Sequence, residues 1–179
     1  YIKKKKLNGK IINNILKNCK SKISILDTAE DYNLNSLTKK KFNKFIVNTK
    51  IDIDIFKRSE KQIINYFQKI NKFYNIDVLF VRNLENEYKN IKIFNIIKKL
   101  KDLKFIKRLG ISVYSFENIK KLFENICYDV IQLPSNIFDN RSDIYQNFFR
   151  KKCIEVHARS VFLQGAIFLK KNSLNFKST

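Results

Sequence analysis

Three residues in the first third of the chain could together carry out acid catalysis. Asp27 ends an apolar run, Tyr32 follows it by five residues, and Lys50 ends a second apolar run. A buried lysine beside an aspartate is held charged, and its ammonium lowers the pKa of a nearby tyrosine by favouring the phenolate. Such a tyrosine can protonate a developing alkoxide, which the reduction of a carbonyl group by hydride requires.

The same residue types also have ordinary structural roles. An aspartate can cap a helix and a tyrosine can lie half-buried, while lysine occurs 31 times in this chain. The spacing of Asp27, Tyr32 and Lys50 therefore leaves the catalytic and the structural interpretations both open.

The formal net charge of +21 would ordinarily indicate a nucleic-acid or anionic membrane partner. However, 31 of the 37 basic residues are lysines spread along the chain, and only six are arginines. Proteins that read nucleic acids favour arginine and gather the charge on one face. Asn, Ile and Phe, whose codons are also A/T-rich, are abundant, so we attribute the charge to genome composition. We expect no nucleic-acid partner, although a basic nucleic-acid-binding protein remains an alternative.

The 179 residues, 44% of them hydrophobic, are expected to fold as one domain spanning residues 1–179. No apolar run reaches the roughly 18 residues of a membrane span, so no membrane partner is expected. Cys19, Cys127 and Cys153 are odd in number, far apart and without C-x-x-C spacing. They predict neither a disulfide nor a metal site, and a reducing cytoplasm fits best. The oligomeric state stays open.

Six β-branched, apolar runs alternate with segments whose apolar residues recur at helical spacing. Strands are expected at 23–26, 44–49, 76–81, 105–113, 128–133 and 153–158. Helices are expected at 11–19, 63–73 with Ser59 as N-cap, 91–100, 119–126 and 144–149. This alternation predicts an α/β fold with a parallel sheet covered by helices.

The choice between a doubly wound sheet and a (β/α)8 TIM barrel depends on glycine. The chain has three glycines, at 9, 110 and 165, and no G-x-G-x-x-G loop after a strand, so the barrel is preferred. In barrels the chemistry lies where strands end and βα loops begin. We therefore expect one rim to gather the polar residues at the strand ends, which are Asp27, Lys50, Arg82, Asn83, Ser112, Gln132, Arg159 and Ser160.

Six segments in order resemble the aldo-keto reductase family. "DTAEDYN" is similar to the family's D-T-A-x-x-Y-G, and "IVNTK" to its strand-end T-K. "DVLFVRN" resembles D-x-L-x-x-H-N, and "LGISVYS" resembles I-G-V-S-N-F. "DVIQLPSNIFD" is similar to D-V-I-Q-x-P-Y-N-x-F, and "VHARSVFLQGAIF" to the A-R-S-x-F-L-Q-G-L-L of a bacterial branch.

The resemblance implies reduction of an aldehyde or ketone, with NADPH as the usual cofactor and NADH as the other candidate. The bacterial branch alone suggests a sugar or sugar-derived substrate. Tyr32 would be the acid, Lys50 would lower its pKa, and Asp27 would hold Lys50. Ser112 and Gln132 match residues that bind the nicotinamide carboxamide. Three further residues are implied in cofactor binding, at the position of a stacking ring and at the start of the pyrophosphate loop: Arg159, Ser160 and Phe162.

The chain departs from the family pattern in several places. Arg82 stands where the catalytic His would orient the carbonyl; Arg82 can donate hydrogen bonds there but cannot act as a neutral imidazole. His157, the one histidine, lies in a later strand and is expected to pack. Val113 replaces a carboxamide-binding Asn, and Asn33 replaces a Gly. A helix around Leu37 should be short or missing.

A complete barrel takes roughly 250 residues, whereas this chain has 179. The resemblance runs from just before the family's second strand to just after its seventh, which predicts a partial barrel of about six β/α units. We favour a fragment of a longer product over a degenerate copy. The alternative to an active reductase is a catalytically impaired barrel that binds a nicotinamide nucleotide as a sensor or partner protein, which the loss of the His favours.

Overall fold

The computed structural model describes residues 9–19, 22–30, 44–84, 90–117, 119–124 and 126–168. Its strands are β1 Ile25–Ala29, β2 Ile46–Asp52, β3 Ile76–Arg82, β4 Ile106–Ser112, β5 Val130–Pro134 and β6 Glu155–Arg159. The α-helices are α1 Gly9–Cys19, α3 Glu60–Asn71, α4 Ile91–Asp102, α5 Ile119–Leu122 and α6 Gln146–Lys151. Within these ranges the 3-10 helices are η2 Ile53–Lys57, η4 Arg141–Tyr145 and η5 Leu163–Phe168.

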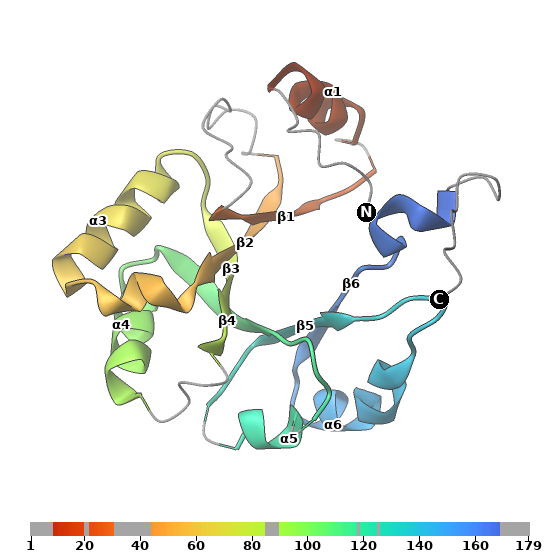
Figure 1. The fold of residues 1–179 in the computed structure, drawn as a ribbon. Helices are drawn as coiled ribbons and strands as arrows, with labels where there is room; N and C mark the ends of the chain where they lie inside the picture. Colours follow the sequence, from red (N-terminus) through yellow and green to blue (C-terminus); the bar gives the residue numbers. More distant parts are fainter. Residues whose placement is uncertain are drawn as a thin grey trace, which may run out of the picture.

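The strands form one parallel sheet whose order in space is their order in the chain, β1 to β6. The sheet curls, and α3 to α6 cover its convex side (Figure 1). β1 and β6 are the two edges of this curled sheet. The predicted α/β partial barrel of six strands is therefore confirmed.

Most predicted elements are present, with shifted ends. β1 and β2 begin two residues later than expected and extend beyond the polar residues that were taken as their ends. Asp27 and Lys50 therefore lie inside strands. α5 covers only Ile119–Leu122 of the predicted 119–126. The region around Leu37 lies outside the described residues.

The helix α3 shows how local sequence sets an element. The Ser59 side chain accepts from the Gln62 amide at 3.4 Å, and the Gln62 side chain accepts from the Ser59 amide at 3.0 Å, which forms the capping box. Ile63 and Phe67, four residues apart, are fully buried against the sheet. The N-cap predicted at Ser59 is thus confirmed.

The two faces of the sheet differ in polarity. Side chains that pack toward the helices are apolar and form the main core, among them Leu79, Val81, Ile111, Ile131 and Leu133. The concave face has a small apolar cluster of Val78, Phe80 and Val130. Alternation of side chains along each strand assigns the polar residues between the core positions to this concave face.

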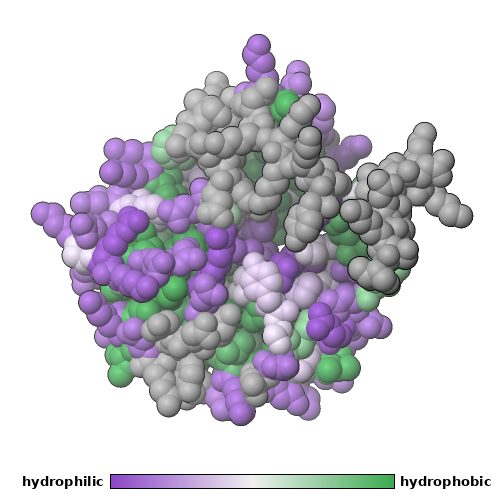
Figure 2. All heavy atoms as spheres, viewed as in Figure 1, coloured by the Kyte–Doolittle hydropathy of each residue, from purple (hydrophilic) through white to green (hydrophobic). Residues whose placement is uncertain are grey.

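The face of the molecule in Figure 1 is drawn with all atoms in Figure 2. Hydrophilic residues surround much of its periphery and are not confined to one element. Within the described ranges, the helices are too short or too polar to cross a membrane. Cys19, Cys127 and Cys153 are free thiols.

Gly110 is required by close packing on the concave face. A Cβ at this position would lie 2.4 Å from a ring carbon of Phe80 and 2.8 Å from Cγ1 of Val78. Gly110→Ala should therefore lower the free energy of unfolding by about 1–3 kcal/mol, because these neighbours are fully buried. Urea denaturation measures the change, and Lys107→Ala, which changes an exposed side chain of the same strand, is the control. In the double variant with Phe80→Leu, the loss should be smaller than the sum of the single losses; simple additivity would contradict the contact.

Candidate active site

The side chain of Gln132 joins four strands on the concave face. It is 3% exposed, and its Nε2 donates to Oδ2 of Asp27 on β1 at 3.0 Å. Its Oε1 accepts from Oγ of Ser112 on β4 at 3.2 Å and from Nζ of Lys50 on β2. Asp27 and Lys50 are therefore brought together through the amide of Gln132.

The electrostatic environment of Lys50 combines burial with charges of both signs. Burial lowers the pKa of Lys50 below its usual value of 10.5, and the Asp27 carboxylate acts in the opposite direction. The nearby guanidinium groups of Arg159 and Arg82 lower this pKa further. The ammonium also lies 5.8 Å from the ring centroid of Phe80. Asp27 is thus the group that favours the charged form of Lys50.

A cavity of about 450 Å³ opens beside this network. Its lining comes from both edges of the curled sheet and comprises Ile25, Asp27, Asn48, Gln132, His157, Ala158, Arg159 and Ser160. Asn48 is 1% exposed, and its Oδ1 has no hydrogen-bond partner. A buried amide oxygen without a partner is costly, so this wall is suited to a polar ligand.

Arg159 ends β6, and neutral groups hold its guanidinium. Nη2 donates to the carbonyl oxygen of Val113 at 2.9 Å, and Nη1 lies 3.5 Å from Oγ of Ser160. The guanidinium carbon is 4.2 Å from the ring centroid of Tyr114, which is 65% exposed. Nε is buried and has no partner. Where the resemblance implies a stacking aromatic ring, this chain therefore has a fixed cation stacked on Tyr114.

The chain turns sharply after Arg159. Ser160, Leu163 and Gln164 have φ of 59°, 49° and 56°, and Gly165 has φ of 87°. Ser160 lines the cavity. Phe162 is 58% exposed and its ring lies 5.6 Å from that of Phe168. Ser160 thus borders the cavity, whereas the described contact of Phe162 is with η5.

The other two predicted catalytic residues are Arg82 and Tyr32. Arg82 ends β3, opposite Asp52 in the register, and affects the site through its charge on Lys50. Tyr32 lies outside the described residues, as does Asn33. The structure therefore places Asp27, Lys50, Ser112 and Gln132 in one network and Arg82 near it.

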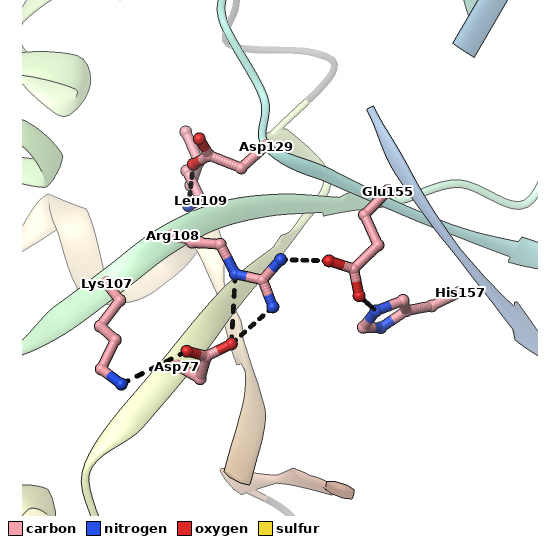
Figure 3. Close-up of polar contacts among 7 residues, drawn as sticks. All are labelled: Asp77, Lys107, Arg108, Leu109, Asp129, Glu155 and His157. Carbon is pink, nitrogen blue, oxygen red and sulfur yellow. Dashed lines mark hydrogen bonds and ion pairs between the residues drawn. The ribbon is translucent and has the colours of Figure 1, made fainter. Parts of the chain in front are cut away.

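His157 was expected to pack in a strand, and it does lie on β6 with its ring 5.9 Å from that of Phe80. However, it also lines the cavity, and its Nε2 lies 2.6 Å from Oε1 of Glu155. Glu155 in turn accepts from Arg108, whose Nη2 lies 2.6 Å from Oδ2 of Asp77 (Figure 3). The ring of His157 therefore packs in the strand, as expected, and its Nε2 also joins the polar contacts through Glu155 and Arg108.

Three residues of the site were not identified from the sequence as functional candidates. Asn48 precedes Lys50 by two residues, and His157 precedes Arg159 by two. Residues two apart on a strand lie on the same face of the sheet, so Asn48 shares the face of Lys50 and His157 that of Arg159. Strand periodicity could therefore have identified Asn48 and His157 from the sequence. Tyr114 had no such signal, because it follows the end of β4 and meets Arg159 only in the folded chain.

Solved structures similar to this one are aldo-keto reductases. The apo form of aldo-keto reductase AKR11C1 from Bacillus halodurans aligns with a TM-score of 0.72 and 18% identity, covering 96% of this chain and 62% of that one. The aldo/keto reductase from Brucella melitensis aligns with a TM-score of 0.65 and 16% identity, covering 88% and 66%. A mutant of Gox0644 in complex with NADPH aligns with a TM-score of 0.65 and 14% identity, covering 88% and 61%.

The fold is that of the aldo-keto reductases. At identities of 18% and below, these structures establish the fold but not the activity or the substrate of this chain. The chain spans 62% of the length of the Bacillus halodurans reductase, as a partial barrel should. No protein-family profile and no curated protein matches the sequence.

Glu155 should make the fold sensitive to acid. Hydrogen bonds from His157 and then from Arg108 hold the pKa of Glu155 below its usual 4.5. Stability from these contacts is thus present above about pH 4.5 and is lost as pH falls through the lower folded-state pKa. Urea unfolding between pH 3 and 7 should show that Glu155→Gln is less stable than the parent near neutrality and that the difference shrinks below about pH 4.5. Glu124→Gln, on an exposed glutamate, is the control; a pH-independent difference for Glu155→Gln would contradict this account.

Removing the Asp27 charge should lower the pKa of Lys50 further, because Asp27 is the group that raises it. In Asp27→Asn, the Lys50 amine should become reactive at lower pH than in the parent chain. Acetylation of Lys50 as a function of pH, followed by mass spectrometry of peptides, measures this. Asp52→Asn, which removes a carboxylate from the same strand as Lys50, is the matched control. An equal shift in the two variants would show that the effect is a general one of net charge.

Proposed function

We propose that this chain carries the catalytic residues of an NAD(P)H-dependent reductase that converts an aldehyde or ketone to an alcohol. The observation that supports it most is the network in which Gln132 connects Asp27 and Lys50 on the concave face. An aldo-keto reductase fold supports the same proposal, and a Gox0644 mutant with that fold is in complex with NADPH. In this proposal residues 1–179 are one domain of a cytoplasmic enzyme.

In this proposal Tyr32 is the general acid and Lys50 is the charge that lowers the pKa of Tyr32. Asp27 keeps Lys50 in its ammonium form, and Gln132 holds the two side chains in fixed positions by hydrogen bonds to both. Arg82 contributes positive charge beside the developing alkoxide, where its guanidinium can donate hydrogen bonds.

The residues proposed for the nicotinamide nucleotide fit such a group. Ser112 Oγ donates to Gln132 and keeps lone pairs for an incoming amide, and Gln132 Nε2 uses one of its two N–H groups on Asp27. The Arg159 and Tyr114 stack offers planar surface beside the cavity, and Ser160 borders it. A bound NADPH or NADH would supply the hydride. Phe162 belongs to this proposal as the start of the loop after Ser160.

Tyr32→Phe tests the proposed acid. It should lower carbonyl reduction by roughly 10²- to 10⁴-fold, equivalent to about 3 to 5.5 kcal/mol, because it removes a proton donor used in the transition state. Lys50→Met should act similarly. Oxidation of NADPH in the presence of a panel of aldehydes and ketones measures turnover, and NADPH fluorescence measures cofactor binding, which Tyr32→Phe should leave nearly unchanged.

The control for the tyrosine test is Tyr88→Phe, which removes a hydroxyl that the proposal gives no role. Turnover that survives Tyr32→Phe would refute the mechanism. Cofactor binding without turnover in the parent chain would instead indicate the sensor function.

A further inference from the structure

Arg159 is a cation at the cavity wall with no acidic partner among the described residues. Its contacts are the Val113 carbonyl, the Ser160 hydroxyl and the Tyr114 ring, and all three are uncharged. They fix the position of the guanidinium without neutralising it. A guanidinium held in place in advance loses little conformational freedom when it binds an oxyanion.

The carboxylates near this wall are already engaged. Asp139 accepts two hydrogen bonds from Arg141, each at 2.8 Å. Glu155 accepts from Arg108 and contacts His157, and the charge of Asp27 acts on Lys50. Arg159 also helps to lower the pKa of Asp139, but Arg141 is the main cause, so these carboxylates have other cations as their main partners.

Two residues that line the cavity also carry a buried polar atom that is unsatisfied. These atoms are Nε of Arg159 on β6, a donor, and Oδ1 of Asn48 on β2, an acceptor. A ligand with an oxyanion and a hydroxyl group could satisfy both, because the oxyanion accepts from Nε and the hydroxyl donates to Asn48.

We propose that the carbonyl compound reduced at this site carries an anionic group, a carboxylate or a phosphate ester, and that Arg159 determines this specificity by binding it. The proposal rests on the proposed function for the identity of the reacting group. The anion site itself depends only on the geometry around Arg159.

The anion site can be tested directly by NMR of the arginine Nε–H groups in the full chain, which has six arginines. The probes are product analogues in matched pairs, 4-hydroxybutanoate with 4-hydroxybutanamide and glycerol 3-phosphate with glycerol. The Arg159 Nε–H resonance, assigned by its loss in Arg159→Gln, should shift saturably with an anionic probe and not with its neutral counterpart. The pair that produces the shift distinguishes carboxylate from phosphate recognition.

Three results would overturn the proposal. The Arg159 resonance could fail to shift with either anion, or it could shift equally with sulfate at the same concentration, which would show unspecific charge binding. It could also shift with NADP⁺ so that the anionic probes compete with NADP⁺, which would assign Arg159 to the cofactor phosphates.

The kinetic test compares glyceraldehyde 3-phosphate with glyceraldehyde, and 4-oxobutanoate with its methyl ester. Arg159→Gln should lower the ratio of kcat/KM for the preferred anionic substrate to that for its neutral partner by about 10- to 100-fold, as expected for a charge-assisted hydrogen bond. Arg141→Gln, which removes a guanidinium already paired with Asp139, should leave the ratio unchanged. Turnover without charge preference would refute the anion proposal and leave the reductase intact. Saturable anion binding without turnover would support the anion site and refute the reductase function.

Discussion

The buried amide of Gln132 sets the geometry of the concave face. A buried amide must have partners for both its oxygen and its nitrogen, since each unsatisfied group costs about 1–3 kcal/mol. Gln132 meets this need with Asp27, Lys50 and Ser112, two of which lie 105 and 82 residues away in the chain. A shift of β1 or β2 by one residue would turn Asp27 or Lys50 to the other face and break the arrangement. The polar network and the register of the sheet therefore depend on each other.

The ring of Phe80 contacts both sets of polar side chains on the concave face. It is 5.8 Å from the Lys50 ammonium, which belongs to the Gln132 network, and 5.9 Å from the His157 ring. His157 in turn contacts Glu155, which accepts from Arg108 (Figure 3). The close approach of Gly110 to Phe80 makes room for this ring. Packing and electrostatics therefore constrain the same positions on this face.

The sequence predicted the number, order and parallel arrangement of the strands, because β-branched runs and helical periodicity are local signals. It misplaced the ends of β1 and β2, since Asp27 and Lys50 interrupt the apolar runs from which the strand ends were read. A polar residue inside a curled sheet breaks such a run without ending the strand. Contacts between residues far apart in the chain also could not be predicted from local sequence patterns. The stacking of Arg159 on Tyr114 joins residues that no periodicity connects.

In the proposed site, the binding of an anionic substrate at Arg159 would be coupled to the protonation of Lys50. Arg159 and Arg82 lower the pKa of Lys50, so an anion bound at Arg159 would offset part of that effect and favour the ammonium. Linkage makes the coupling reciprocal: a ligand that raises the pKa of Lys50 binds more tightly when Lys50 is protonated. The ammonium proposed to lower the pKa of Tyr32 would then be most fully formed when the substrate is bound. The additional positive charge of Arg82, where the resemblance implies a histidine, thus fits a substrate that brings its own negative charge.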